Sequence, residues 1–219
     1  MTLRNYFYTE KRFIVTSAIL LLCIGIYLMF PARSIFEGFV ISIVALIIIP
    51  ILHVKLVLKE NLEQWRLGKG HWNPRILMTI TVSFLTACGL FSLIHFTTDF
   101  SAQYAGLLPA KIFDQFGSFL LFNMTIVLFS VFLYEIFFRG FVLSLFSERI
   151  GWWSVIVQFL AVTIVLIIGF DNRFFLDVPY ILIAPFAGVV AYITRSVWYT
   201  IPFSFLTIIL FNSIIIMTQ

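Results

Sequence analysis

Glu135 and Arg139 are the two residues of this chain whose types and spacing most suggest chemistry. They lie four positions apart near the end of an otherwise apolar run, so a helix would place the carboxylate and the guanidinium about 40° apart on one face. In water such a pair contributes little to stability. At the centre of a lipid bilayer each charge costs roughly 2.5–3.5 kcal/mol. A pair held there would need a functional or structural reason.

The composition indicates that the pair does belong to a membrane protein. The chain has 219 residues, of which 62% are hydrophobic and 11% are charged, and its mean hydropathy is +1.08. These values lie far outside the range of soluble globular proteins. The apolar runs are long enough to cross a ~30 Å hydrocarbon core as helices, and the alternating segments of a barrel are missing from the sequence. The sequence therefore predicts an all-α fold, a polytopic helical membrane bundle.

About seven apolar runs are candidates for transmembrane helices. The first follows basic residues, but it is longer than the apolar region of a usual signal peptide and no small-residue cleavage site follows it, so we interpret it as an uncleaved span. Neither a repeat nor a linker divides the chain, which predicts a single membrane domain over residues 1–219. The runs cover residues 13–30, 36–57, 76–97, 119–142, 152–170, 179–193 and 197–217.

The connection after the second run, residues 58–75, is the only extensively polar stretch of the sequence. Leucine, tryptophan and basic residues alternate in it, a composition typical of a segment that lies among lipid headgroups. It is too short to form a core of its own. We therefore expect it to lie at the membrane surface and not to form a separate domain.

Basic residues predict the orientation of the bundle. Ten of the fourteen Lys and Arg residues precede the first run or follow the second, fourth and sixth runs, whereas three lie in the alternate connections. The positive-inside rule then places the protein in the cell membrane with its N-terminus in the cytoplasm and, for seven spans, its C-terminus outside. All five tryptophans would lie at the cytoplasmic interface. Because membrane topology explains the basic residues, the net charge of +4 does not indicate a nucleic-acid partner.

No metal and no cofactor is expected. The sequence contains no HExxH, GxSxG, P-loop or GxGxxG motif. The histidines at positions 53, 71 and 95 have no further ligand at the spacing of a metal site. Cys23 and Cys88 lie inside predicted spans without a CxxC spacing, and we interpret both as small buried hydrophobes.

Two interpretations of the charged pair remain open. In the structural one, Arg139 extends to the cytoplasmic headgroups and Glu135 neutralises it. In the functional one, Glu135 lies roughly 10 Å inside the end of its span, deep enough to require a polar cavity. Gly188 and Ala191 indicate close helix packing. The remaining polar residues of the spans are expected to form interhelical hydrogen bonds; they are Asn123, Ser130, Gln158, Thr163, Ser204, Thr207 and Asn212.

Three groups of residues occur in order in the second half of the chain: Glu135-x-x-x-Arg139-Gly140, Glu148-Arg149-Ile150-Gly151-Trp152 and Ser196-Val197-Trp198. Over roughly residues 130–212 the chain thereby resembles the CPBP (ABI) family of intramembrane glutamic-type proteases. That family includes prenyl-protein CAAX endopeptidases and bacterial proteins linked to bacteriocin processing and self-immunity. The resemblance implies a CPBP-like core at about residues 119–217.

The catalytic pattern of that family is incomplete in this chain. The family has a paired Glu-Glu-x-x-x-Arg, then Phe-x-x-x-His on the next span and a histidine on the last one. Matched position by position, Tyr134 stands at the first glutamate, Ile167 and Ser204 stand at the two histidines, and only Glu135 and Arg139 remain. A tyrosine is neutral at pH 7. The loss of a general base alone typically lowers the rate by about 10²–10⁴-fold.

The sequence therefore predicts a CPBP-family membrane protein with a degenerate protease site. We expect it to be a non-catalytic binding, scaffold or immunity protein for another membrane or envelope protein or peptide. One alternative is an active intramembrane CAAX-type endopeptidase that uses Glu135, which requires His53 or His95 to approach the carboxylate. A second alternative is a small proton-coupled carrier in which Glu135 titrates, although a salt bridge to Arg139 favours a fixed charge. The lipid bilayer is the other expected partner.

Overall fold

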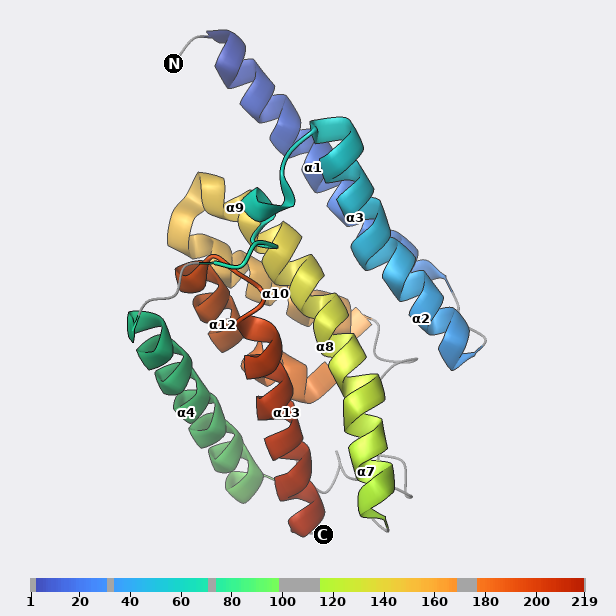
Figure 1. Ribbon diagram of the computed structural model, residues 1–219, viewed down its shortest axis with the longest axis vertical. Coiled ribbons are helices and arrows are strands. Elements are labelled where there is room, and N and C mark those ends of the chain that lie inside the picture. Colours follow the sequence, from blue (N-terminus) through green and yellow to red (C-terminus); the bar gives the residue numbers. More distant parts are fainter. Residues whose placement is uncertain (1–2, 31–33, 71–73, 99–114, 169–176, 219) are drawn as a thin grey trace.

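The computed structural model describes residues 3–30, 34–70, 74–98, 115–168 and 177–218. Within these ranges every regular element is a helix and none is a strand (Figure 1), which confirms the predicted all-α class. The predicted connections at 99–114 and 169–176 lie outside the described residues, as do His71 and Trp72.

Five helices of the described chain are long and apolar enough to cross a membrane, so the chain is a multi-pass membrane protein. The predicted fourth and fifth runs belong to one helical stretch of 53 residues. The predicted sixth run forms the shorter helix α12 (Asp177–Thr194). The count of seven spans therefore stays a prediction. The five long helices are α1 (Leu3–Met29), α2 (Ile35–Ile43) to η2 (His53–Leu58), α4 (Pro74–Thr97), α7 (Phe116–Phe122) to α10 (Ser154–Ile168), and α13 (Thr200–Met217).

Both composite helices contain π-helical segments, in which the hydrogen bonds run from residue i to i+5 and the turn is wider than in an α-helix. Such segments are frequent at functional sites, and the longest of them begins at Glu135. The first composite helix continues from α2 through η1 (Val44–Ile48) and α3 (Ile49–Leu52) into η2. The second continues from α7 through η4 (Asn123–Val127), α8 (Leu128–Tyr134), η5 (Glu135–Val142), α9 (Leu143–Ile150) and η6 (Gly151–Trp153) into α10.

A turn at Gly151 bends the 53-residue stretch. Gly151 follows the last residue of α9 and has a φ of +54°, a left-handed conformation that costs glycine little because it has no Cβ. The 3₁₀ turn η6 follows, and α10 then packs against α9 and α12. The predicted boundary between the fourth and fifth runs falls at this turn.

Helix α12 lies at the centre of the bundle and contacts α4, α10 and α13 (Figure 1). Small residues allow this close approach, as Gly188 illustrates. A Cβ added there would lie 2.5 Å from Gln158 Oε1 on α10. The prediction of close packing at Gly188 and Ala191 is therefore confirmed, and Ala191 is fully buried. Asn212 on α13 donates a hydrogen bond to the Asn123 side chain at 3.1 Å, which confirms the interhelical role predicted for both. The same prediction is wrong for Thr207, which donates to a carbonyl of its own helix, and for Gln158 and Thr163, whose side chains have no hydrogen-bond partner in the described chain.

The segment between η2 and α4 crosses the end of the bundle at which the described part of α1 begins (Figure 1). Its short 3₁₀-helix η3 (Leu62–Trp65) carries Trp65, of which only 1% is exposed. The Ser196 hydroxyl donates to the Gly68 carbonyl at 2.7 Å, and the Trp198 indole donates to the Leu67 carbonyl at 3.0 Å. Trp65 is thus buried in protein and does not lie at a lipid interface as predicted, because this segment folds against the bundle.

Candidate functional site

The predicted pair lies on η5, all of whose residues are buried. Glu135 and Arg139 are both 0% exposed, and Arg139 Nε lies 3.5 Å from Glu135 Oε2. The wider π-helical turn keeps residues i and i+4 neighbours on one face, so the contact predicted from an α-helix is confirmed. The position of Arg139 differs from the one expected in the structural interpretation of the sequence. Arg139 does not extend to the surface, because its guanidinium is enclosed by other helices.

Tyr180 on α12 joins the two charges. Its hydroxyl donates to Glu135 Oε1 at 2.9 Å and accepts a hydrogen bond from Arg139 Nη1. The guanidinium carbon of Arg139 also lies 4.8 Å from the centre of the Tyr180 ring, within the range of a cation–π contact. One tyrosine therefore stabilises the anion through its proton and the cation through its oxygen and its ring.

Two further groups complete the contacts of the pair. The Ser204 hydroxyl on α13 donates to Glu135 Oε1 at 2.7 Å, and Arg139 Nη2 donates to the Ala184 carbonyl at 3.3 Å. Ala184 lies inside α12, directly before Pro185. Side chains of three helical segments thus meet around one buried ion pair. We call this group of four residues the Glu135 cluster: Glu135, Arg139, Tyr180 and Ser204.

The hydrogen bonds within the Glu135 cluster are distributed unevenly. Oε1 of Glu135 accepts two of them, whereas Oε2 and Arg139 Nε have no hydrogen-bond partner within the described chain. These two atoms face each other at 3.5 Å, longer than the ~2.7–2.9 Å of a charge-assisted hydrogen bond. Their attraction is therefore mainly Coulombic, and Tyr180 and Ser204 fix the direction of the carboxylate.

The residues that stand at the family's catalytic positions do not all meet. Ser204 contacts Glu135, whereas Ile167 is 59% exposed. Tyr134 turns its hydroxyl away from Glu135 and pairs it with the hydroxyl of Tyr27 on α1 at 2.8 Å, as expected for adjacent residues that point about 100° apart on a helix. Tyr134 therefore lies beside the Glu135 cluster without contacting its carboxylate.

Sequence reasoning missed Tyr180. The residue directly follows Pro179 at the start of the sixth apolar run and resembles an ordinary interfacial tyrosine there. Among the described side chains of α12, its hydroxyl is the donor that reaches Glu135. The sequence feature that could have indicated Tyr180 is its hydroxyl, which stands alone at the start of a short apolar run. The other polar side chains of that run lie at its C-terminal end. Recognising its partner requires knowing that α12 packs at the centre of the bundle.

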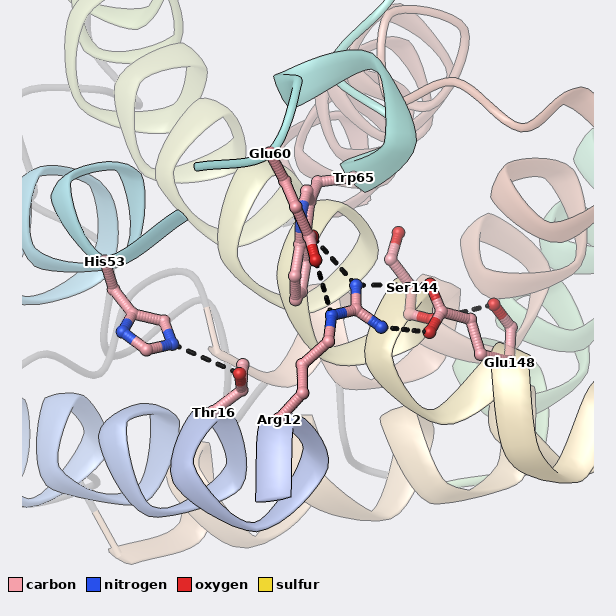
Figure 2. Close-up of polar contacts among 8 residues, drawn as sticks. Arg12, Thr16, His53, Glu60, Trp65, Ser144 and Glu148 are labelled. Carbon is pink, nitrogen blue, oxygen red and sulfur yellow. Dashed lines mark hydrogen bonds and ion pairs between the residues drawn. The ribbon is translucent and has the colours of Figure 1, made fainter. Parts of the chain in front are cut away.

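His53 and His95, the two histidines in the described part of the chain, lie away from Glu135. His53 is buried and shares a hydrogen bond with the Thr16 hydroxyl at 3.1 Å (Figure 2). His95 lies against the rings of Phe91 and Phe96 on α4. Neither imidazole is among the partners of Glu135 within the described ranges. No group of three or more His, Cys, Asp or Glu side chains that could hold a metal ion occurs among those residues either.

A second polar cluster surrounds Arg12 on α1, which points towards Glu60 and Glu148 (Figure 2). Arg12 Nε lies 2.6 Å from Glu60 Oε1, and Arg12 Nη1 lies 2.5 Å from Glu148 Oε2. The Trp65 indole donates to Glu60 at 2.9 Å. Arg12 thus connects α1 to the segment after η2 and to α9. The sequence did not indicate this cluster because its carboxylates are distant along the chain.

Comparison of the whole chain with models of protein families, with characterised proteins and with solved structures finds no significant match. The resemblance to the CPBP family therefore rests on the sequence residues that carry it.

Proposed function

We propose that this chain is a seven-span membrane protein of the CPBP type with a degenerate protease site, and that it functions by binding. Its partner would be another membrane or envelope protein or peptide, for which the chain serves as a scaffold, regulator or immunity protein. One observation carries the proposal. The Glu135 carboxylate is completely buried, and its hydrogen bonds go to Tyr180 and Ser204 of the same chain.

This arrangement does not favour hydrolysis. A general base must reach the proton that it removes, yet Oε1 of Glu135 already accepts two hydrogen bonds and no imidazole contacts the carboxylate in the described chain. Arg139 balances the negative charge at 3.5 Å. The family positions that would activate water hold Tyr134, Ile167 and Ser204. A carboxylate in these surroundings serves to orient helices, not to activate a nucleophile.

The role of the Glu135 cluster is then to fix how η5, α12 and α13 pack. Removing one member of a buried ion pair is strongly destabilising, and a polar network can select one packing among several. A bundle fixed in this way presents constant outer faces to a partner. The exposed apolar residues of α4, such as Met78 at 69% and Leu85 at 63%, are available to lipid or to another transmembrane helix.

The proposed orientation places the N-terminus in the cytoplasm of a cell and the C-terminus outside. Support comes from the packing of basic connections at one end of the bundle. Arg12 contacts Glu60, Arg149 contacts Glu10, and Arg66 contacts Tyr192. All of these residues belong to the end that the positive-inside rule assigns to the cytoplasm.

Co-purification tests the binding function. The tagged protein is extracted from native membranes in mild detergent. The associated proteins are compared between the parent chain, Tyr180→Phe and Tyr192→Phe, which serves as a matched control outside the cluster. A specific partner that is retained by the control and lost with Tyr180→Phe supports the proposal. If the parent chain retains no specific membrane or envelope protein, a binding function is overturned.

Reconstitution distinguishes the two alternatives. The purified protein and a Glu135→Gln variant are placed in liposomes with candidate membrane peptides and with a pH-sensitive dye. We expect neither cleavage nor proton flux from either protein. Cleavage that depends on Glu135 would establish the endopeptidase, and proton flux that depends on Glu135 would establish the carrier.

A further inference from the structure

A polar cavity of about 420 Å³ lies between the segment after η2, α9 and the end of α12. It is separate from the Glu135 cluster, with which it shares no residue. Its volume falls within the range of small-ligand pockets. Arg66 and Arg195 both line the cavity and give it two positive charges.

Arg66 is the inner cation of the cavity. Only 7% of it is exposed. Its guanidinium donates to the Ala191 and Tyr192 carbonyls and to the Ser147 hydroxyl, the last at 3.0 Å. No carboxylate forms an ion pair with Arg66 within the described ranges. A buried charge without a counter-ion is costly, so this guanidinium is suited to an anion that comes from outside the chain.

Arg195 adds a second positive charge to the same cavity. It is exposed and has a left-handed backbone conformation with a φ of +54° at the turn between α12 and α13. Burial and, next, the nearby charge of Arg195 lower the pKa of Arg66 to about 10. The two guanidinium groups therefore repel each other, and an anion between them would relieve this repulsion.

Ser144 on α9 supplies a neutral donor. It is 4% exposed and lines the cavity, yet its hydroxyl has no hydrogen-bond partner in the described chain. Buried hydroxyl groups without a partner are uncommon in proteins. The Tyr192 ring, over which Arg66 lies at 5.5 Å, forms another part of the lining. Two cations and an unused hydroxyl thus face one space.

The carboxylates of the cavity do not cancel these cations. Glu148 is already paired with Arg12 at 2.5 Å. Glu63 is exposed and accepts a weak hydrogen bond from the Asn61 amide at 3.4 Å. Negative charge therefore lies at the outer part of the cavity and in the Arg12 cluster, whereas the inner part carries the unpaired guanidinium of Arg66.

We propose that this cavity binds a phosphate group between Arg66 and Arg195, with the Ser144 hydroxyl as an additional donor. Guanidinium groups match the geometry of phosphate oxygens and bind them through two parallel hydrogen bonds. The phosphate comes from a lipid headgroup or from a soluble phosphate compound, since the cavity lies at an end of the bundle. This inference is independent of the proposed binding of a protein partner.

Thermal unfolding of the full-length protein in a sugar-based, phosphate-free detergent tests the proposal. One arm adds inorganic phosphate against sodium chloride of equal ionic strength. A second arm adds phosphatidic acid against an uncharged diacylglycerol. We expect a rise in melting temperature of at least about 2 °C in one arm, and the arm that responds identifies the source of the phosphate. The absence of a rise in both arms overturns the proposal.

Matched variants localise the effect. Arg195→Gln changes an exposed residue, and Ser144→Ala removes a hydroxyl that has no partner, so we expect both to fold. We expect Arg195→Gln to weaken binding of the responding probe about ten- to a hundredfold and Ser144→Ala about two- to tenfold. Lys69→Gln, an exposed cation of the same segment outside the cavity, should bind like the parent chain. Equal binding by Arg195→Gln and the parent chain would refute this site.

Discussion

The hydroxyl of Tyr180 lies 2.9 Å from Glu135 Oε1, although the two residues are 45 positions apart in the chain. The hydroxyl oxygen of Tyr180 also accepts a hydrogen bond from Arg139 Nη1. An i,i+4 pair on one helical turn is thereby attached to a second helix. This attachment distinguishes the Glu135 cluster from a charge pair that merely neutralises itself.

Replacing Tyr180 by phenylalanine should destabilise the protein by about 1–3 kcal/mol, because Glu135 Oε1 and Arg139 Nη1 each lose a hydrogen bond inside the bundle. The packing of the ring is retained. Thermal unfolding in detergent, followed by tryptophan fluorescence, measures the loss. Tyr192→Phe, outside the cluster, should shift the melting temperature much less. Equal shifts for the two variants would contradict the role assigned to Tyr180.

The ion pair itself should behave non-additively. Glu135→Leu and Arg139→Met each leave the opposite charge buried, for which the expected cost is about 3–5 kcal/mol. The double variant leaves no charge and should cost clearly less than the sum of the two single variants. A double-mutant cycle on unfolding free energies gives the coupling. Additive effects would show that the 3.5 Å contact contributes nothing.

Gly188 should not tolerate a larger residue. An alanine Cβ would lie 2.5 Å from Gln158 Oε1 and 3.1 Å from a Val155 methyl group, so overpacking of about 1–3 kcal/mol is expected. Gln158→Ala in the same chain should recover part of this loss. Gly89→Ala on α4 is the matched control, since its added methyl group meets no atom within 4 Å. A Gly188→Ala variant as stable as this control would argue against the close approach of α10 and α12.

The hydrogen bond between Asn123 and Asn212 should contribute modestly. Hydrogen bonds between transmembrane helices average about 0.6 kcal/mol and reach about 1.7 kcal/mol, so Asn212→Leu should destabilise within this range. Ser213→Ala on the same helix is a suitable control, because the Ser213 hydroxyl donates only to the carbonyl of Ile209 in its own helix. Unfolding in increasing denaturant measures the stability of the Asn212→Leu and Ser213→Ala variants. A neutral Asn212→Leu would mean that the 3.1 Å contact adds no stability.

Local spacing explains what the sequence could predict. Glu135 and Arg139 are neighbours on any helix, and apolar run length alone indicates membrane helices, so both the contact and the all-α class follow from residues close together in the chain. The hydrogen bond from Ser204 to Glu135 agrees with the interhelical role expected for the polar residues of the spans. The sequence left open whether Arg139 reaches the surface, and the structure buries it, since burial depends on which helices cover η5.

Contacts between distant residues explain what remained hidden. Tyr180 is a partner of Glu135 only because α12 occupies the centre of the bundle. Trp65 and Arg66 belong to a polar segment whose composition is typical of headgroup regions, yet both are buried because that segment folds over the bundle end. No periodicity in a single sequence encodes such a tertiary arrangement, and the same holds for the carboxylates around Arg12.

The distances along the chain between Arg12 and its two carboxylates set an order for assembly during synthesis. Glu60 follows Arg12 by 48 residues and Glu148 follows it by 136. As the chain leaves the ribosome, the first helices can therefore pair through Arg12 and Glu60 well before α9 exists. Because Glu148 is made later, we expect α9 to join an N-terminal pair of helices that has already formed, with that pair as the template for the rest of the bundle.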